Sequence, residues 1–172
     1  SRGTVERANV DHAQALPLFR RACESLERGL GHEHPHTLVA LASLAECLEA
    51  LEQVDAALPM RERALFAALR SDGIEHPRTL WSGMALARCV QRHAPTAAVL
   101  AVCERALPVL ERGLGPEHPA TLACTTRLAE CLRGQDRAGD ALPLMRRAVE
   151  AYEKALGRTH PTVVKCRSDL AG

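Results

Sequence analysis

The chain has 172 residues, enough for one domain with a substantial core. Its 22 basic and 21 acidic side chains leave a net charge of +1, and only 2% of the residues are aromatic, so we expect no nucleic-acid partner. The sequence has no apolar run of membrane-spanning length and no charged-then-apolar leader, so we expect a soluble chain without a membrane partner. Because it starts at Ser1 rather than at methionine, we also expect a fragment of a longer protein.

Cysteine usage indicates the compartment. The chain has seven cysteines, an odd number, and no C-x-x-C pair. This favours free, mostly buried thiols in a reducing compartment over a disulfide framework. We therefore expect a cytoplasmic protein.

One short pattern recurs every 42 residues along the chain. A glycine precedes each His-Pro pair by three residues, and a threonine follows the proline by two in the first three copies. Cysteine keeps the same period at residues 47, 89 and 131, which is typical of an equivalent core position rather than of catalysis. The His-Pro pairs are His34-Pro35, His76-Pro77, His118-Pro119 and His160-Pro161.

Each repeat is expected to form two helices, A and B. The first unit is predicted to start near the end of its helix A. In the second, leucines and alanines at helical spacing predict helix A over 35–51, a short polar turn, and helix B over 55–70. Such pairs bury their apolar faces only by stacking, so we predict one all-α domain of about four units, a right-handed α-solenoid with a concave face lined by helices A. The units lie near 1–31, 34–73, 76–115 and 118–157, with a final helix A over 160–172.

Glycine and proline mark the predicted helix ends. Gly31 is suited to the left-handed residue that ends a helix, and Pro35 to the first position of the next. Pro59 is predicted in the first turn of a helix B, where proline is tolerated, and so are Pro17 and Pro143 in their units.

The third unit departs from this rule. Pro108 falls well inside its helix B, and an interior proline costs about 3 kcal/mol. We therefore predict a kink or break over residues 104–108. Thr96 is predicted to cap the start of the same helix.

The stretch G-H-E-H-P-H-T-L, residues 31–38, raises the question of a metal site. His32 and His36 have no counterpart in the other units, whereas His34 recurs in all of them. Zinc needs three or four convergent ligands. We interpret His34 as part of its turn and the other two as surface variation, and we expect neither a metal nor a cofactor.

Residues 114–157, LGPEHPATLACTTRLAECLRGQDRAGDALPLMRRAVEAYEKALG, resemble the 42-residue tetratricopeptide repeats of kinesin light chain and of nephrocystin-like proteins. The resemblance covers nearly the whole chain and implies a scaffold or adaptor for protein binding. The N-N-L-A pattern of kinesin light chain is not kept, because Ala42-Ser43 and Thr126-Arg127 stand before Leu44 and Leu128. The asparagine clamp for a peptide backbone is therefore not expected.

Placing the tetratricopeptide pattern on this register predicts which residues line the concave groove. Its centre is basic with one tryptophan and one methionine, and its first segment is acidic. Because arginines bind carboxylates at two points and Trp and Met offer adaptable apolar contact, we predict an acidic peptide partner with a hydrophobic anchor. The alternative is a solvated face of paired charges. The predicted groove residues are Glu46, Trp81, Met84, Arg88, Arg92, Arg127, Glu130 and Arg133.

Two other functions are alternatives to this scaffold. The sequence has no Gly-rich phosphate loop and no nucleophile beside a base, so we do not expect an enzyme. Apolar ends without polar caps would instead favour a self-assembling module, whose ends stack on other copies or on further repeats of a parent protein.

Overall fold

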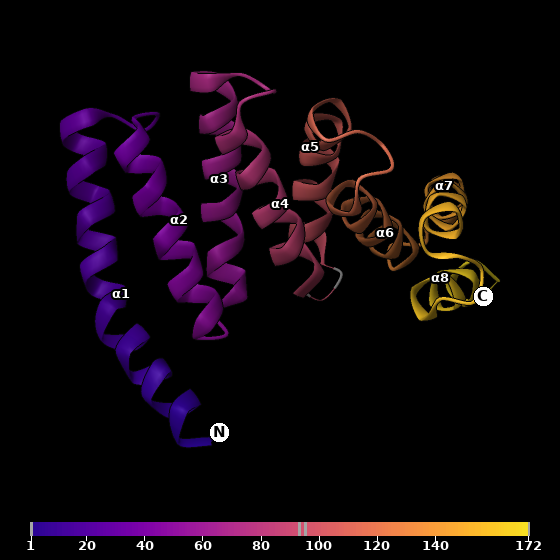
Figure 1. Cartoon of the computed structure of the whole chain (residues 1–172), viewed down its shortest axis with the longest axis horizontal. Helices are drawn as coiled ribbons and strands as arrows, with labels where there is room; N and C mark the ends of the chain where they lie inside the picture. The colour runs from indigo at the N-terminus through magenta and orange to yellow at the C-terminus, as the bar shows by residue number, and fades with distance from the viewer. Residues whose placement is uncertain (1, 93, 95, 172) are drawn as a thin grey trace. The chain divides into compact units, whose positions relative to one another are not determined.

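The computed structural model describes residues 2–92, 94 and 96–171, with side chains from residue 11 to residue 170. Over these residues all regular secondary structure is helical, with eight helices and no strand (Figure 1). The helices are α1 (Arg2–Leu30), α2 (Pro35–Ala50), α3 (Val54–Asp72), α4 (Pro77–Arg92), α5 (Ala97–Gly113), α6 (Pro119–Arg133), α7 (Ala138–Leu156) and α8 (Pro161–Ala171).

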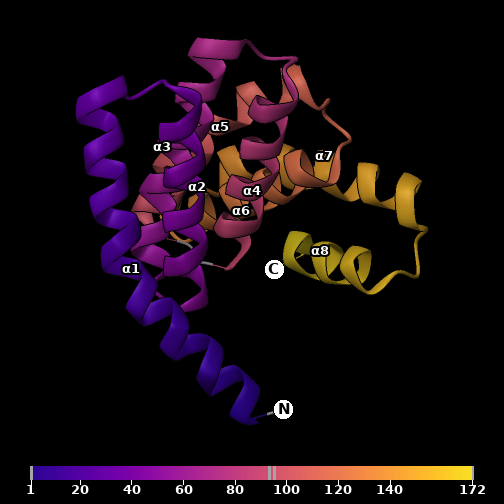
Figure 2. The ribbon, with the colours of Figure 1, turned by 60° about the vertical axis from the view of Figure 1, so that its left-hand side comes forward.

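The helices form two compact units, residues 1–92 and 93–172. In the first unit α1 packs on α2, α2 on α3 and α3 on α4. In the second unit α5, α6, α7 and α8 pack in the same successive way. Figures 1 and 2 both show α1, α2 and α3 lying side by side. Successive helices within each compact unit therefore pack on one another, as the repeat predicts.

The helix bounds agree closely with the repeat. Helix A was predicted over 35–51 and is found as Pro35–Ala50, and helix B was predicted over 55–70 and is found as Val54–Asp72. The cysteine column is buried as predicted, with Cys47, Cys89 and Cys131 at most 3% exposed. The period of the sequence thus fixes both the elements and their core-facing sides.

Histidine caps the start of each helix A. The Nδ1 atom of His34 accepts a hydrogen bond from the backbone N–H of His36 at 3.2 Å, and His76, His118 and His160 do the same two residues on, at 3.1 to 3.2 Å. This satisfies one of the N–H groups that a helix start leaves without an intrahelical partner. The prediction that His34 is committed to its turn is confirmed.

The glycine before each histidine ends the preceding helix. Gly73 has φ 87° and ψ 175°, a region that only glycine adopts readily. Its carbonyl accepts a hydrogen bond from the Thr79 hydroxyl at 2.7 Å, and Gly31 and Thr37 repeat this contact at 2.8 Å. The recurrent Gly, His and Thr are therefore one local structure that joins a helix B to the next helix A.

The first repeat, near residues 1–31, differs from the prediction. A helix A end and a turn were expected before its helix B, but α1 is one continuous helix from Arg2 to Leu30. The corresponding turns of later units place Glu52 and Asp136 at φ 58° and 59°. The residue at this place in the first unit is Val10, and a β-branched residue strongly disfavours positive φ. The chain there stays helical.

The interior prolines are also better tolerated than predicted. Pro59 and Pro143 are each the sixth residue of their helix, beyond the first turn, and Pro17 lies deep inside α1. Helix α5 is continuous from Ala97 to Gly113 through Pro108, so the predicted break is wrong, while a bend there stays a prediction. Val99, Ala106 and Leu110 of the same helix are at most 2% exposed, and this burial stabilises it. The predicted cap is confirmed, because Thr96 Oγ1 accepts from the Val99 N–H at 3.3 Å.

Candidate functional site

Two large apolar side chains of the first compact unit, residues 1–92, are exposed at equivalent positions of the repeat. Val39 on α2 is 61% exposed and Trp81 on α4 is 63% exposed, and the two are 42 residues apart. The second unit has no such pair, because Ala123 is buried and Lys165 is charged at the corresponding positions. A tryptophan normally buries most of its large surface, so the exposure of Trp81 makes it a candidate binding residue.

Trp81 begins a stripe along α4. Met84 is half-buried, and Arg88 and Arg92 are exposed. Spacings of three, seven and eleven residues from Trp81 place these side chains on one side of the helix. Arg88 makes no ion pair or hydrogen bond with its side chain within the part of the chain that the structure describes. We call Trp81, Met84, Arg88 and Arg92 the α4 face.

A carboxylate on α2 holds the end of this face in place. Glu49 accepts from Nε of Arg61, a buried α3 side chain, at 2.7 Å. Its second oxygen lies 3.7 Å from Nη1 of Arg92, whose Nη2 donates to the Glu49 carbonyl at 3.3 Å. Glu46 is exposed and reaches Arg61 only at 3.9 Å. Glu49 therefore positions Arg92, while Glu46 is left mostly to solvent.

Sequence reasoning missed Arg61. Its equivalents in the other helices B are Phe19, Cys103 and Met145, all apolar. A lone arginine in an apolar column was the available signal, because a buried guanidinium needs a carboxylate partner.

The remaining predicted groove residues belong to the second unit. Arg127 pairs with Glu130 on its own helix at 2.6 Å, as the interpretation of a solvated, paired face expected. Arg133 donates to the Asp169 carbonyl of α8. The two units thus differ: the first presents exposed apolar and basic groups, and in the second the arginines are engaged by neighbouring groups.

The seven cysteines are free and buried. Burial is the main cause that raises the pKa of Cys89 to about 12, with the Glu49 charge adding to it, and burial likewise raises the pKa of Cys131 to about 11. A thiol must ionise to act as a nucleophile or metal ligand. Cys89 and Cys131 therefore keep their protons near neutral pH.

The histidines near the first repeat junction do not converge on a common point. His34 and His36 have ring centroids 5.3 Å apart, with Nδ1 of His34 used in its cap, and Nδ1 of His32 lies 3.6 Å from Glu27. Among the described residues, no group of three or more His, Cys, Asp or Glu is placed to hold a metal ion. Within the same residues, every helix is too short or too polar to cross a membrane.

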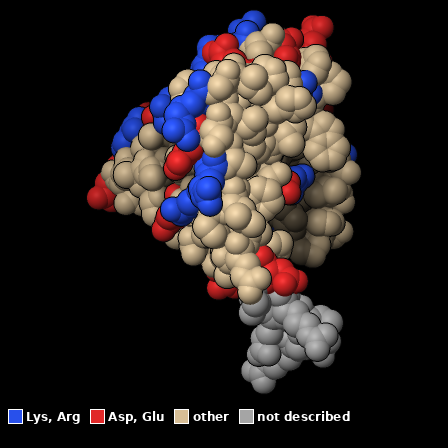
Figure 3. All heavy atoms as spheres, turned by 90° about the vertical axis from the view of Figure 1, so that its left-hand side faces the viewer, with Lys and Arg blue, Asp and Glu red and all other residues tan. Residues whose placement is uncertain are grey.

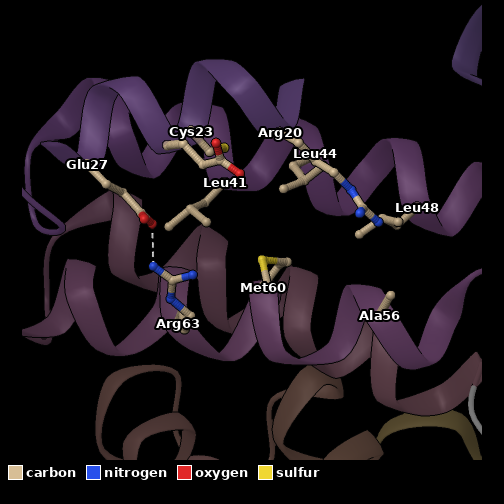
Figure 4. Close-up of a pocket in the computed structure, with 10 residues that line it drawn as sticks. Arg20, Cys23, Glu27, Leu41, Leu44, Leu48, Ala56, Met60 and Arg63 are labelled. Atoms are coloured by element: carbon tan, nitrogen blue, oxygen red, sulfur yellow. Dashed lines mark hydrogen bonds and ion pairs between the residues drawn. The ribbon is translucent and has the colours of Figure 1, made fainter. Parts of the chain in front are cut away.

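One cavity of the first unit lies between α1, α2 and α3 (Figure 4). It measures about 320 Å³, with Leu41, Leu44 and Met60 in its lining and an ion pair between Arg63 and Glu27 at one side. Cys23 also lines it, but this thiol is 5% exposed and burial raises its pKa. The cavity therefore has the character of a packing gap rather than of a reactive site.

Comparison with known proteins identifies the repeat. A family model described as tetratricopeptide repeat matches residues 1–67 and 98–154, which together are more than half of the chain. A search of curated proteins found no match. The match to the family model confirms the resemblance of the 42-residue units to tetratricopeptide repeats.

Solved structures show the same fold. The chain is similar to the "kinesin light chain nearly identical TPR-like repeats" of Podosopora anserina, with 24% identity, a TM-score of 0.65, and 98% of this chain and 81% of that chain covered. A single-substitution variant of that protein gives the same identity and coverage with a TM-score of 0.66. BtubC (BKLC) from P. vanneervenii is 17% identical, with a TM-score of 0.60 and coverage of 96% and 64%. The predicted all-α repeat solenoid class is confirmed.

Proposed function

Because the chain belongs to the tetratricopeptide repeat family, whose repeats generally mediate contacts between proteins, we propose that it is a protein-interaction scaffold and not an enzyme. We propose that its α4 face binds an acidic peptide that carries a hydrophobic anchor.

The observation that supports this most is the exposure of Trp81 beside an arginine without a partner among the described residues. Trp81 is the single tryptophan of the chain and is 63% exposed, and Arg88 lies two helical turns further along the same side of α4. Exposed tryptophan and arginine are the residue types that most often dominate the binding energy of protein interfaces. A guanidinium that is not already paired can bind a partner carboxylate without breaking an internal contact.

Binding of a labelled peptide tests the proposal. The probe is a fluorescent peptide that alternates glutamate with alanine around one central leucine, titrated with the chain at low salt. Trp81→Ala should weaken binding because the anchor loses its apolar contact, and Arg88→Glu should abolish it because like charges repel. Affinity that is unchanged in both variants would contradict the proposal.

Two controls separate the site from general charge effects. Arg146 on α7 is exposed and, within the described part, makes no ion pair, so Arg146→Glu changes the net charge equally and should leave affinity almost unchanged. A second peptide with lysine in place of glutamate should not bind. Equal loss in Arg146→Glu and Arg88→Glu would show a diffuse charge effect instead of a face on α4.

A further inference from the structure

Helix α1 has an open apolar side. Figure 3 shows this face of the first unit, where residues other than Lys, Arg, Asp and Glu cover a broad area beside a band of charge. Leu18 is 64% exposed, Ala22 is exposed, and three further apolar side chains of the helix are half-buried. We call Ala15, Leu18, Phe19, Ala22 and Leu26 the open face of α1.

The equivalent side is covered in later helices B. In α3, which packs on α2, Ala64 is 4% exposed and Ala57 and Ala68 are fully buried. In α7, which packs on α6, Ala148 is fully buried and Ala141 is 1% exposed. The open face of α1 therefore has the sequence and shape of a helix B stripe that a helix A normally covers.

Helix α8 has the complementary character. It begins with the His160 cap and Pro161, like every helix A, and it packs on α7. Its Val164 is 54% exposed, whereas the equivalent Leu38 and Leu122 of α2 and α6 are at most 4% exposed. In those two units the helix A is followed by a helix B that packs on it. The described part of α8 thus exposes an apolar residue at a position that is covered in α2 and α6.

We propose that α8 of one copy of this chain packs on the open face of α1 of a second copy, so that the two together complete one tetratricopeptide unit. The contact is head-to-tail, because each copy uses α8 on one side and α1 on the other. Such a contact is not limited to two copies and can continue from copy to copy.

Charge pairing agrees with this register. Within each compact unit, an arginine of the second helix B pairs with a glutamate of the first helix B. These pairs are Arg63 with Glu27, and Arg147 with Glu111. Arg21 occupies the arginine position in α1, is exposed, and makes no ion pair within the described part of the chain.

The matching glutamate is Glu153 of α7. It occupies the same column as Glu27 and Glu111 and is held by Arg158 and Arg167, each at 3.5 Å, and both arginines are exposed. Helix α1 of a second copy, placed on α8 as the next helix B, would bring its Arg21 to Glu153. The same register therefore joins the apolar faces and an opposite charge pair.

The oligomeric state of the chain in solution tests the proposal. One helix-on-helix contact is a small interface, so the mass measured by sedimentation velocity should rise with concentration from the micromolar to the near-millimolar range. Ala22→Arg and Val164→Arg should each be monomeric over that range, because each places a charge on one of the two apolar faces. Circular dichroism should show that both variants stay folded, since both positions are exposed in the single chain.

Mixing the two variants gives the sharpest result. Ala22→Arg keeps the unaltered apolar face of α8, and Val164→Arg keeps the unaltered open face of α1. An equal mixture should therefore form a dimer through this one contact and nothing larger. Val39→Arg, at an exposed position outside both faces, should associate like the unchanged chain. This readout is independent of peptide binding at Trp81, so the two proposals can fail separately.

Three outcomes would overturn the proposal. A constant monomer mass of the unchanged chain at the highest concentration would mean that something other than a second copy covers α1, such as a neighbouring helix of a longer polypeptide. Association that persists in Ala22→Arg would place the contact elsewhere. A mixture of the two variants that stays monomeric would exclude the head-to-tail arrangement.

Discussion

At the scale of single residues, the repeated histidine is a helix cap and not a ligand. Each of the four imidazoles accepts a backbone N–H through Nδ1, and each is followed by a proline at the first helical position. Side-chain caps are worth roughly 0.5–2 kcal/mol. The column is thus explained by local hydrogen bonding alone.

A pair of substitutions at one cap tests this role. His118→Ala removes the acceptor for the Ala120 N–H and should lower the free energy of unfolding by about 1 kcal/mol. His118→Asn keeps an acceptor of similar reach and should lose much less. Urea unfolding followed by circular dichroism measures both, and equal losses would show that the imidazole acts through packing instead.

The buried thiols predict a pH dependence of stability. Burial holds the pKa of Cys89 at about 12, above the ordinary value of 9.0, so the folded state keeps a proton that the unfolded state releases in alkaline solution. Stability from this group is complete below about pH 9 and is lost as the pH rises towards 12. Urea midpoints in this window should fall less steeply in Cys89→Ala than in the unchanged chain, and parallel slopes would contradict this.

At the scale of helices, the structure departs from the predicted helix ends in two places. Pro108 predicted a break in α5, yet the helix continues because its apolar stripe is buried. The repeat predicted a turn near Val10, yet α1 continues because that residue suits helix better than positive φ. The helices that follow from periodicity and capping residues could be predicted from the sequence. Where these local signals disagree with one another or with packing, the sequence did not show which would decide the structure.

Glu49 of α2 and the buried Arg61 of α3 form a polar contact between the two helices. Glu49→Ala leaves the buried Arg61 without its 2.7 Å partner and should cost about 3 kcal/mol. The double variant with Arg61→Met should recover much of this, because α7 carries the buried Met145 at the equivalent position. Glu46→Ala is the control, and should cost less than about 1 kcal/mol since Glu46 is exposed. A Glu49→Ala loss no larger than that of Glu46→Ala would contradict the assignment.

At the scale of the whole molecule, the 42-residue period predicted most of the fold and part of the candidate site. The period placed Trp81, Met84 and Arg88 on one side of one helix, and the exposure of Trp81 agrees with a binding role. The period could not predict that Arg127 is engaged by Glu130, or that Arg92 is held by Glu49, because such pairings depend on side-chain conformations and on contacts between helices. Placing the tetratricopeptide pattern on the sequence therefore predicted the groove residues but not which of their charges are paired.

We propose the α4 face as the binding site of an acidic partner. Trp81 is the single tryptophan and lies in that face, so its fluorescence reports binding there directly. Titration with the glutamate-rich peptide should shift the emission to shorter wavelength and saturate, as the indole loses contact with water, and Arg88→Glu should show no shift. Peptide binding that leaves the emission of Trp81 unchanged would place the binding site outside the α4 face.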